Sequence, residues 1–233
     1  MSGSEDGFRE LLDLYVELVM HDDGDPERSP FPPPVAGDWS PRYRQVPYRA
    51  VDPAALPLDA ENGFHDQTDT ALLEALQQII QREGPIHGTL LTRRLLQALP
   101  TSRSGSRIRA RIEELLQQLV EQGGIQRDGD FIATEQQCHS PPYRDWSILP
   151  DAERQLDHVH DSELMLCLFN TVIRDGPLPV DEAMNRGLHV IGFIRFTAQA
   201  RERMHSPLEN LIGRQRLVQI EDMLNPGPRA LLR

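Results

Sequence analysis

The chain has 233 residues, of which 39% are hydrophobic and 26% charged, and its formal net charge is −12 at pH 7. This composition is ordinary for a globular protein, and the length is enough for two small cores of roughly 60 residues or more each. The acidic balance excludes a protein that coats nucleic acid over its whole surface, because phosphate repulsion would oppose the approach of most faces. Any contact with nucleic acid must therefore be local.

The sequence predicts a cytoplasmic protein without a membrane partner. No stretch approaches the roughly 18 apolar residues that a spanning helix needs, and the opening MSGSEDGFRELL lacks the basic region of a signal peptide. With only Cys138 and Cys167 present, we expect reduced thiols rather than a disulfide framework. All 24 basic residues are arginine, which suits forked contacts with phosphate and is also explained by codon bias in a GC-rich bacterial genome.

The N-terminal region divides into a helix and an arm. Apolar residues at three- and four-residue spacing over 8–20 predict an amphipathic helix, assigned to residues 1–20. Residues 21–67 are crowded with proline, which excludes long helices and central strands, so they are predicted to form an extended arm or linker. The arm contains aromatic residues that are unusual in disordered segments and favour docking on the globular body: Phe31, Trp39, Tyr43, Tyr48 and Phe64.

An internal repeat begins near residue 68. Residues 72–132 align without a gap with residues 164–224, at an offset of 92 positions. The match includes two Gly-Pro pairs, Gly84-Pro85 and Gly176-Pro177, and continues through many apolar positions. Agreement in both apolar spacing and Gly-Pro punctuation indicates an internal duplication.

Each copy is predicted to contain three helices and a small hairpin. In the first copy, residues 68–134, helices are expected over 70–82, 88–98 and 106–122, and short strands over 125–127 and 131–133 around Asp128-Gly129. This is the order of a winged helix-turn-helix. The predicted fold class is therefore mainly α, with tandem winged helix-turn-helix repeats of three helices plus a small β-hairpin each, after an N-terminal helix and a proline-rich arm.

The remaining boundaries follow from composition. Residues 135–161 are polar and contain proline, and they are predicted to form a linker with one helical turn at most. The second copy covers 162–225 and a tail covers 226–233. Since the second copy has no turn dipeptide between its last two apolar stretches, its wing is predicted to be degenerate or absent.

Several phrases of the repeat resemble a bacterial family: EGPIH, LLTRRL, SRSGSRIR and, in the second copy, LHVIGFIRFTAQARERM. They are similar to the uncharacterised winged-helix region at the C-terminal end of large bacterial proteins with a superfamily-one helicase and a restriction-type nuclease. The similarity covers about residues 68–224, duplicated here without the helicase, and the chain has no GxxxxGK[ST] phosphate loop. The resemblance implies association with DNA-processing machinery and no catalysis.

The first copy also contains six arginines with no acid among them between Glu83 and Glu113: Arg93, Arg94, Arg103, Arg107, Arg109 and Arg111. In a helix-turn-helix domain the recognition helix enters the major groove, so these residues are predicted to bind the phosphate backbone of duplex DNA. Alternatively, they neutralise acids elsewhere or bind a protein. The second copy adds acids, Asp181, Glu182 and Glu202, and is expected to bind protein instead.

The predicted function is therefore a non-enzymatic module that binds DNA through the first copy and tethers a protein partner in a DNA-processing complex. The alternative is an acidic tandem winged-helix subunit that binds only protein, in a chromosome-organising or defence complex. A homodimer remains open. No cofactor, catalytic residue or metal site is predicted, because Cys138, His139, His158 and His160 lack a recognised zinc-ligand spacing.

Overall fold

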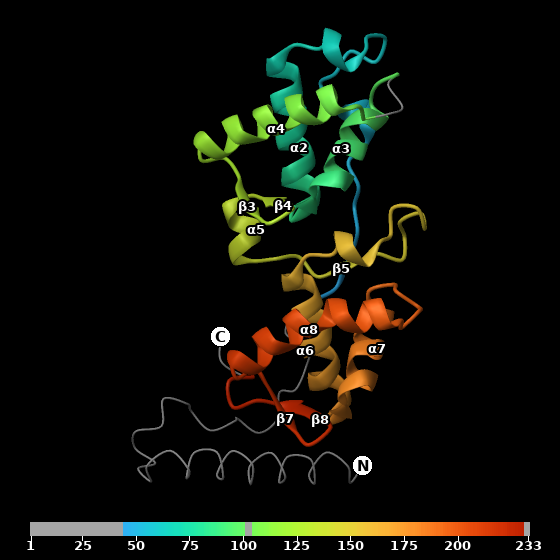
Figure 1. The fold of residues 1–233 in the computed structure, drawn as a ribbon, viewed down its shortest axis with the longest axis vertical. Helices are drawn as coiled ribbons and strands as arrows, with labels where there is room; N and C mark the ends of the chain where they lie inside the picture. The colour runs from blue at the N-terminus through green and yellow to red at the C-terminus, as the bar shows by residue number, and fades with distance from the viewer. Residues whose placement is uncertain (1–43, 101–103, 231–233) are drawn as a thin grey trace. The chain divides into compact units, whose positions relative to one another are not determined.

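The computed structural model describes residues 44–100 and 104–230. The expected helix at 8–20 and the arm up to residue 43 lie outside the described residues, as does Arg103. The described chain is mainly α-helical, which confirms the coarse fold class. It divides into a first compact unit, Val46–His160, and a second that begins at Asp161 (Figure 1).

The repeat within the first unit is built from three helices and a three-stranded antiparallel sheet. In chain order, its main elements are α2 (Asp69–Glu83), β2 (Ile86–His87), α3 (Gly88–Gln97), α4 (Ser106–Glu121), β3 (Gln126–Asp128) and β4 (Phe131–Ala133). The sheet order is β2-β4-β3. Each helix turns one apolar stripe inward, and the stripes form a common core that includes Leu72, Leu76, Ile79, Leu91, Leu95, Ile112, Leu115 and Leu119.

Local chemistry determines where α2 begins and ends. The Thr68 hydroxyl accepts a hydrogen bond from the Ala71 amide at the start of the helix. At its end, the Gln137 side-chain amide donates to the carbonyl oxygens of Ile80 and Gln81, both at 3.0 Å. Gly84 leaves room for this cap, because a Cβ there would clash with the Gln137 side chain and lie 2.7 Å from the Ile80 carbonyl oxygen. Glycine is therefore required for close approach at this helix end.

The second unit has the same order of elements. It consists of α6 (Asp161–Asp175), β6 (Leu178–Pro179), α7 (Val180–Val190), α8 (Ala198–Gly213), β7 (Leu217–Ile220) and β8 (Met223–Pro226). Its sheet order is β6-β8-β7, again antiparallel. The bounds of α6 and α8 lie 92 positions after those of α2 and α4, which is the offset of the sequence repeat.

The prediction of a degenerate or absent wing in the second copy is wrong. Strands β7 and β8 have four residues each, and Ile220 pairs with Met223 across a two-residue turn. In that turn Glu221 adopts a left-handed φ of 52°, where the first unit has Gly129 with φ 56°. The turn therefore forms without the glycine that usually marks it in a sequence.

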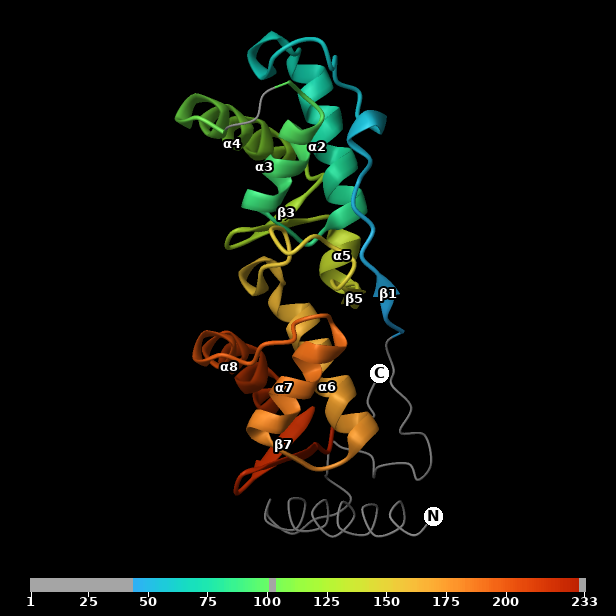
Figure 2. The ribbon, with the colours of Figure 1, turned by 90° about the vertical axis from the view of Figure 1, so that its right-hand side faces the viewer.

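The segments on either side of the first repeat pack on it. The expected linker contains α5 (Glu135–His139), β5 (Arg144–Asp145) and a 3-10 turn, η3 (Leu156–His158), and belongs to the first unit. Strand β1 (Val46–Pro47) pairs with β5 in parallel (Figure 2). The 3-10 turn η1 (Pro53–Ala55) packs on α3. A second 3-10 turn, η2 (Phe64–Asp66), precedes α2. The buried aromatic side chains of these segments are Tyr48, Phe64, Tyr143 and Trp146.

Candidate nucleic-acid interface

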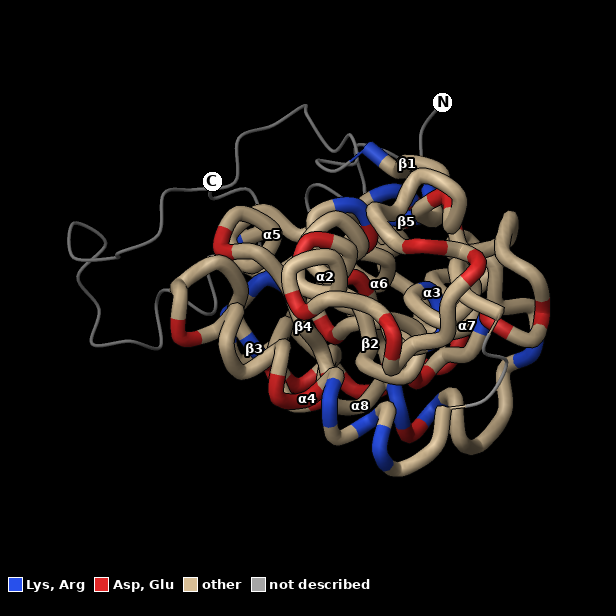
Figure 3. The backbone as a smooth tube through the Cα atoms, turned by 90° about the horizontal axis from the view of Figure 1, so that it is seen from above, with Lys and Arg blue, Asp and Glu red and all other residues tan. Residues whose placement is uncertain are grey.

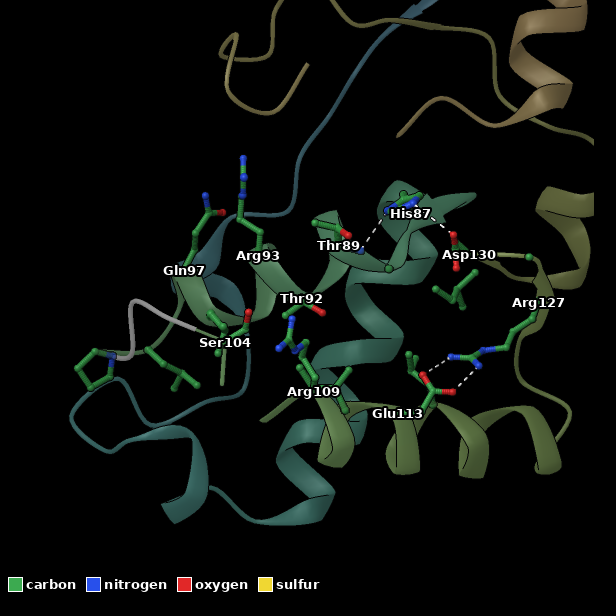
Figure 4. A pocket seen from close by; sticks show the side chains of 18 residues that line it. His87, Thr89, Thr92, Arg93, Gln97, Ser104, Arg109, Glu113, Arg127 and Asp130 are labelled. Atoms are coloured by element: carbon green, nitrogen blue, oxygen red, sulfur yellow. Dashed lines mark hydrogen bonds and ion pairs between the residues drawn. The ribbon is translucent and has the colours of Figure 1, made fainter. Parts of the chain in front are cut away.

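A groove of about 990 Å³ lies in the first unit between α3, the first half of α4 and the β3–β4 hairpin (Figure 4). We call it the α3–α4 groove. Its apolar lining includes Leu96, Ile112, Leu116 and Ile132, which are otherwise buried in the core. Its polar lining is rich in donors and comprises His87, Thr89, Thr92, Arg93, Gln97, Ser104, Arg109, Glu113, Arg127 and Asp130.

Two arginines at the start of α4 are exposed. Arg109 lines the groove and points toward Thr92 and Ser104 (Figure 4). Arg107 lines a smaller hollow of about 330 Å³, which also involves Phe64. Neither guanidinium is in an ion pair with any residue of 44–100 or 104–230. Both charges are therefore available to an anion.

The helix end itself adds to this positive potential. The first turn of α4 contains no acid, and its N-cap residue, Gly105, makes no side-chain capping bond. The first amide N–H groups of a helix lack partners within the helix, and its dipole places positive partial charge at this end. Acids occur only further along α4, as Glu113, Glu114 and Glu121, so the helix changes from blue to red along its length in Figure 3. An anion could approach the first half of α4 more readily than the second.

Arg93, on α3, is half-buried and also lines the groove. Its Nη1 atom donates to the Ala152 carbonyl oxygen at 2.9 Å. Because this acceptor is neutral, the bond orients the guanidinium without cancelling its charge. Arg93 therefore adds a second uncompensated charge to the α3–α4 groove beside Arg109, while Arg107 lines the smaller hollow.

Arg94 was predicted to bind DNA, but it is buried, with 3% of its surface exposed. Its Nε atom lies 3.0 Å from Oε2 of Glu83, and its Nη1 atom lies 2.6 Å from Oε2 of Glu153. Glu83 also accepts hydrogen bonds from the Tyr48 hydroxyl at 2.7 Å and the Val51 amide at 2.8 Å. Burial raises the pKa of Tyr48, so its hydroxyl stays protonated and donates. Arg94 thus stabilises the interior of the first unit and is not part of the candidate interface.

Arg111 has a compensated charge. It pairs with Asp69 and, at 2.6 Å, with Glu114. Hydrogen bonds to Asp69 and then Glu114 raise its pKa. Although no acid lies among the six arginines in the sequence, the fold brings Asp69 to Arg111 from the start of α2. Of the predicted residues, Arg93, Arg107 and Arg109 thus keep uncompensated charge in the described structure.

Arg127 lines the groove from β3 and was not among the predicted residues. Its Nη2 atom donates to Glu113 at 2.8 Å, and this pairing lowers the pKa of the Glu113 carboxyl. The alternation of side chains along the hairpin strands could have predicted that Arg127 lies near α4. Its ion pair with Glu113, however, depends on the tertiary fold. Arg127 therefore contributes a neutralised pair to the groove wall.

The second unit differs at the matching positions. Arg93, Arg107 and Arg109 correspond, 92 residues later, to Asn185, Gln199 and Arg201. Arg201 pairs with Asp181. Two further arginines are also paired, Arg186 with Glu182 and Asp175, and Arg203 with Asp161. At the positions that match Arg93, Arg107 and Arg109, the second unit therefore lacks uncompensated charge.

A histidine cluster borders the groove beside the turn of the β3–β4 hairpin. The rings of His87 and His158 have centroids 4.9 Å apart, and Phe131 contacts both His87 and His160 edge-on. Burial, with smaller contributions from His87 and Arg93, lowers the pKa of His158. Among the described residues, no group of three potential ligands is placed to hold a metal ion.

Comparison with known sequences gives one partial match. The sequence model of a family described as a protein of unknown function, DUF3320, matches residues 62–110, from before η2 to the first residues of α4. No curated protein and no solved structure matches the chain. The matched segment agrees with the expected uncharacterised region, and its description mentions no helicase. In the part of the chain that the structure describes, no helix is both long and apolar enough to span a bilayer.

Proposed function

We propose that the chain is a non-enzymatic tandem winged-helix module. It binds the phosphate backbone of duplex DNA through the first unit and tethers a protein partner within a DNA-processing complex. The order helix, strand, helix, helix, hairpin in each unit, with the first strand added to the hairpin, supports the winged-helix assignment. The resemblance to a helicase-associated region supports the type of complex.

The observation that carries the DNA proposal is the uncompensated charge at the start of α4 and on the α3 side of the groove. Arg107 and Arg109 lie in the acid-free first turn of α4, and Arg93 lines the α3–α4 groove together with Arg109. Guanidinium groups and helix N-termini are both favourable partners for phosphate. The polar lining of the α3–α4 groove adds hydroxyl donors from Thr89, Thr92 and Ser104 beside these charges.

The same geometry defines how DNA binds. The second half of α4 has no cation and ends with the exposed Glu121, which opposes insertion of the whole helix along the major groove, so contact is limited to the start of the helix and to nearby phosphates. We therefore expect binding with little sequence preference. Because the protein carries a net charge of −12, the affinity at physiological salt should be micromolar or weaker unless a partner adds contacts.

Fluorescence anisotropy on a labelled duplex at several salt concentrations tests the proposal. The variant Arg93→Asn/Arg107→Gln/Arg109→Gln carries the second copy's residues at the first two positions and an amide at the third. If each arginine neutralises one phosphate, the slope of log affinity against log salt should fall by about 0.9 per residue, or about 2.7 in total. Arg201→Gln, at the matching but ion-paired position of the second unit, should leave the slope unchanged.

The alternative function is a protein-binding subunit with no DNA contact. The overall acidity and the ion-paired arginines of the second unit favour it. Failure of the wild-type protein to bind the duplex even at low salt would support this alternative. Equal losses in the triple variant and in Arg201→Gln would contradict the division of roles between the units. Metal-dependent nicking of the duplex would instead indicate a nuclease.

A further inference from the structure

The turn between α7 and α8 presents an apolar side chain to solvent. Ile194 is 74% exposed, more than Ile148 at 55% or Val46 at 43%, the other exposed large hydrophobic residues among those described. Two aromatic neighbours, Phe193 and Phe196, are half-buried beside it. Large apolar side chains exposed to this extent often mark contact sites when neighbouring residues are also apolar.

Hydrogen bonds hold this turn in one conformation. The Gly192 and Phe193 amides donate to the carbonyl oxygens of His189 at 3.0 Å and Leu188 at 2.9 Å. The His189 Nε2 atom lies 2.8 Å from the Ile194 carbonyl oxygen. Gly192 has a φ of 100°, which favours glycine. A turn held in this way loses little conformational entropy when a partner binds it.

The internal repeat provides a comparison for the same turn. Residues 193–196 read FIRF, and the matching residues 101–104 of the first copy read TSRS. The arginine is retained, while three hydroxyl side chains are replaced by large apolar ones. Since the first unit has the same order of elements with hydroxyl residues at these positions, the repeated fold does not require an isoleucine there. The apolar turn is therefore a property that distinguishes the second copy.

Charge near the turn indicates the chemistry of its partner. Arg195 is exposed and makes no ion pair within the described residues, whereas Arg186 and Arg201 of the same unit are paired. An exposed isoleucine next to an available guanidinium is complementary to an apolar pocket with a carboxylate at its edge. Isoleucine offers no hydrogen bond or charge to a phosphate, and the net charge of −12 opposes a nucleic acid or an anionic lipid surface.

We propose that the 193–196 turn is the docking element for the protein partner. Ile194 enters an apolar pocket of that protein, and Arg195 pairs with a carboxylate at the edge of the pocket. This inference rests on the protein-tethering part of the proposed function and is independent of DNA binding.

Site-specific photo-cross-linking in the native host tests the proposal. The full-length chain carries p-benzoylphenylalanine at position 194 and, as a matched control, at position 148, which is also an exposed isoleucine. We expect one protein adduct at 194 that is absent at 148, mapped by mass spectrometry to an apolar segment with a nearby aspartate or glutamate. An adduct with a second copy of the chain, a lipid adduct, equal labelling at both positions, or no adduct would each overturn the proposal.

Calorimetry with the purified partner protein, once cross-linking has identified it, then tests the two side chains. Ile194→Ser introduces the residue type of the matching Ser102, and it and Arg195→Glu should each weaken binding about tenfold or more. Changing the mapped carboxylate of the partner to lysine should restore binding of the Arg195→Glu variant. Losses below threefold, or no restoration, would overturn the assignment. Both variants should bind duplex DNA like the wild type, so the result is independent of the DNA measurement.

Discussion

Replacing Arg94 with alanine should destabilise the first unit by about 3–5 kcal/mol, because two buried carboxylates lose their cation. Glu83 is 1% exposed and Glu153 is 8% exposed, and Arg94 hydrogen-bonds both. The Tyr48 hydroxyl and the Val51 amide still donate to Glu83, so we expect a loss at the lower end of this range. The second repeat provides a control, since Arg186 occupies the matching position and its side chain is 46% exposed.

Urea unfolding followed by tryptophan fluorescence measures this loss. Trp146 is buried in the first unit, with its ring centroid 4.6 Å from that of Tyr48, and Trp39→Phe makes it the only tryptophan. With a urea dependence of about 2 kcal/mol per molar, Arg94→Ala should lower the midpoint by roughly 1.5 M. Arg186→Ala should leave the midpoint of Trp146 fluorescence at the wild-type value. Equal midpoints for the two variants would refute the assignment of Arg94 as a buried structural cation.

Three further outcomes are expected. Burial and the neighbouring His87 lower the pKa of His158 in the folded state. The contribution of His158 to folding stability is therefore fully present above the unfolded-state pKa of 6.5 and is lost as the pH falls below that value. The urea midpoint of the first unit should therefore decrease between pH 7 and pH 5, and a His158→Phe variant that keeps the same slope would contradict this. Gly129→Ala should cost about 1 kcal/mol in thermal unfolding because φ is 56°, whereas Glu221→Ala, at the matching turn position, should cost less than about 0.5 kcal/mol. Gly84→Ala should cost about 1–3 kcal/mol, since a Cβ has no room at that helix end, and an unchanged thermal midpoint would show that the cap is dispensable.

The helices could be predicted because the same apolar spacing occurs in both copies of the repeat. In both copies the spacing and the Gly-Pro pair mark the same boundaries, and the observed helices α2 (Asp69–Glu83) and α4 (Ser106–Glu121) agree with the predictions to within one residue. The second hairpin was missed because Glu221 holds a left-handed turn position that sequence patterns associate with glycine. A side chain that tolerates this conformation leaves no local signal.

The candidate interface was only partly predictable, since charge along the chain does not determine charge in space. Arg94 has its acidic partners 11 and 59 residues away, so its ion pairs could not be read locally. One signal was present, because Arg94 lies three residues after Leu91 on the buried stripe of α3. The packing of the arm was also hidden, since β1 pairs with β5 nearly a hundred positions later.

The Glu83–Arg94 pair has consequences for how this protein could evolve. Recombination at the limits of the sequence repeat would transfer 68–134 without Tyr48, Val51 or Glu153. Glu83 would then lose two hydrogen-bond donors, and Arg94 would lose one of its two carboxylate partners. The corresponding pair in the second unit, Asp175 and Arg186, is partly exposed to solvent. The shortest segment that recombination could transfer with the first unit intact is therefore longer than the repeat. We expect recombination breakpoints to be tolerated before residue 46 and after residue 160, rather than at the boundaries of the duplication.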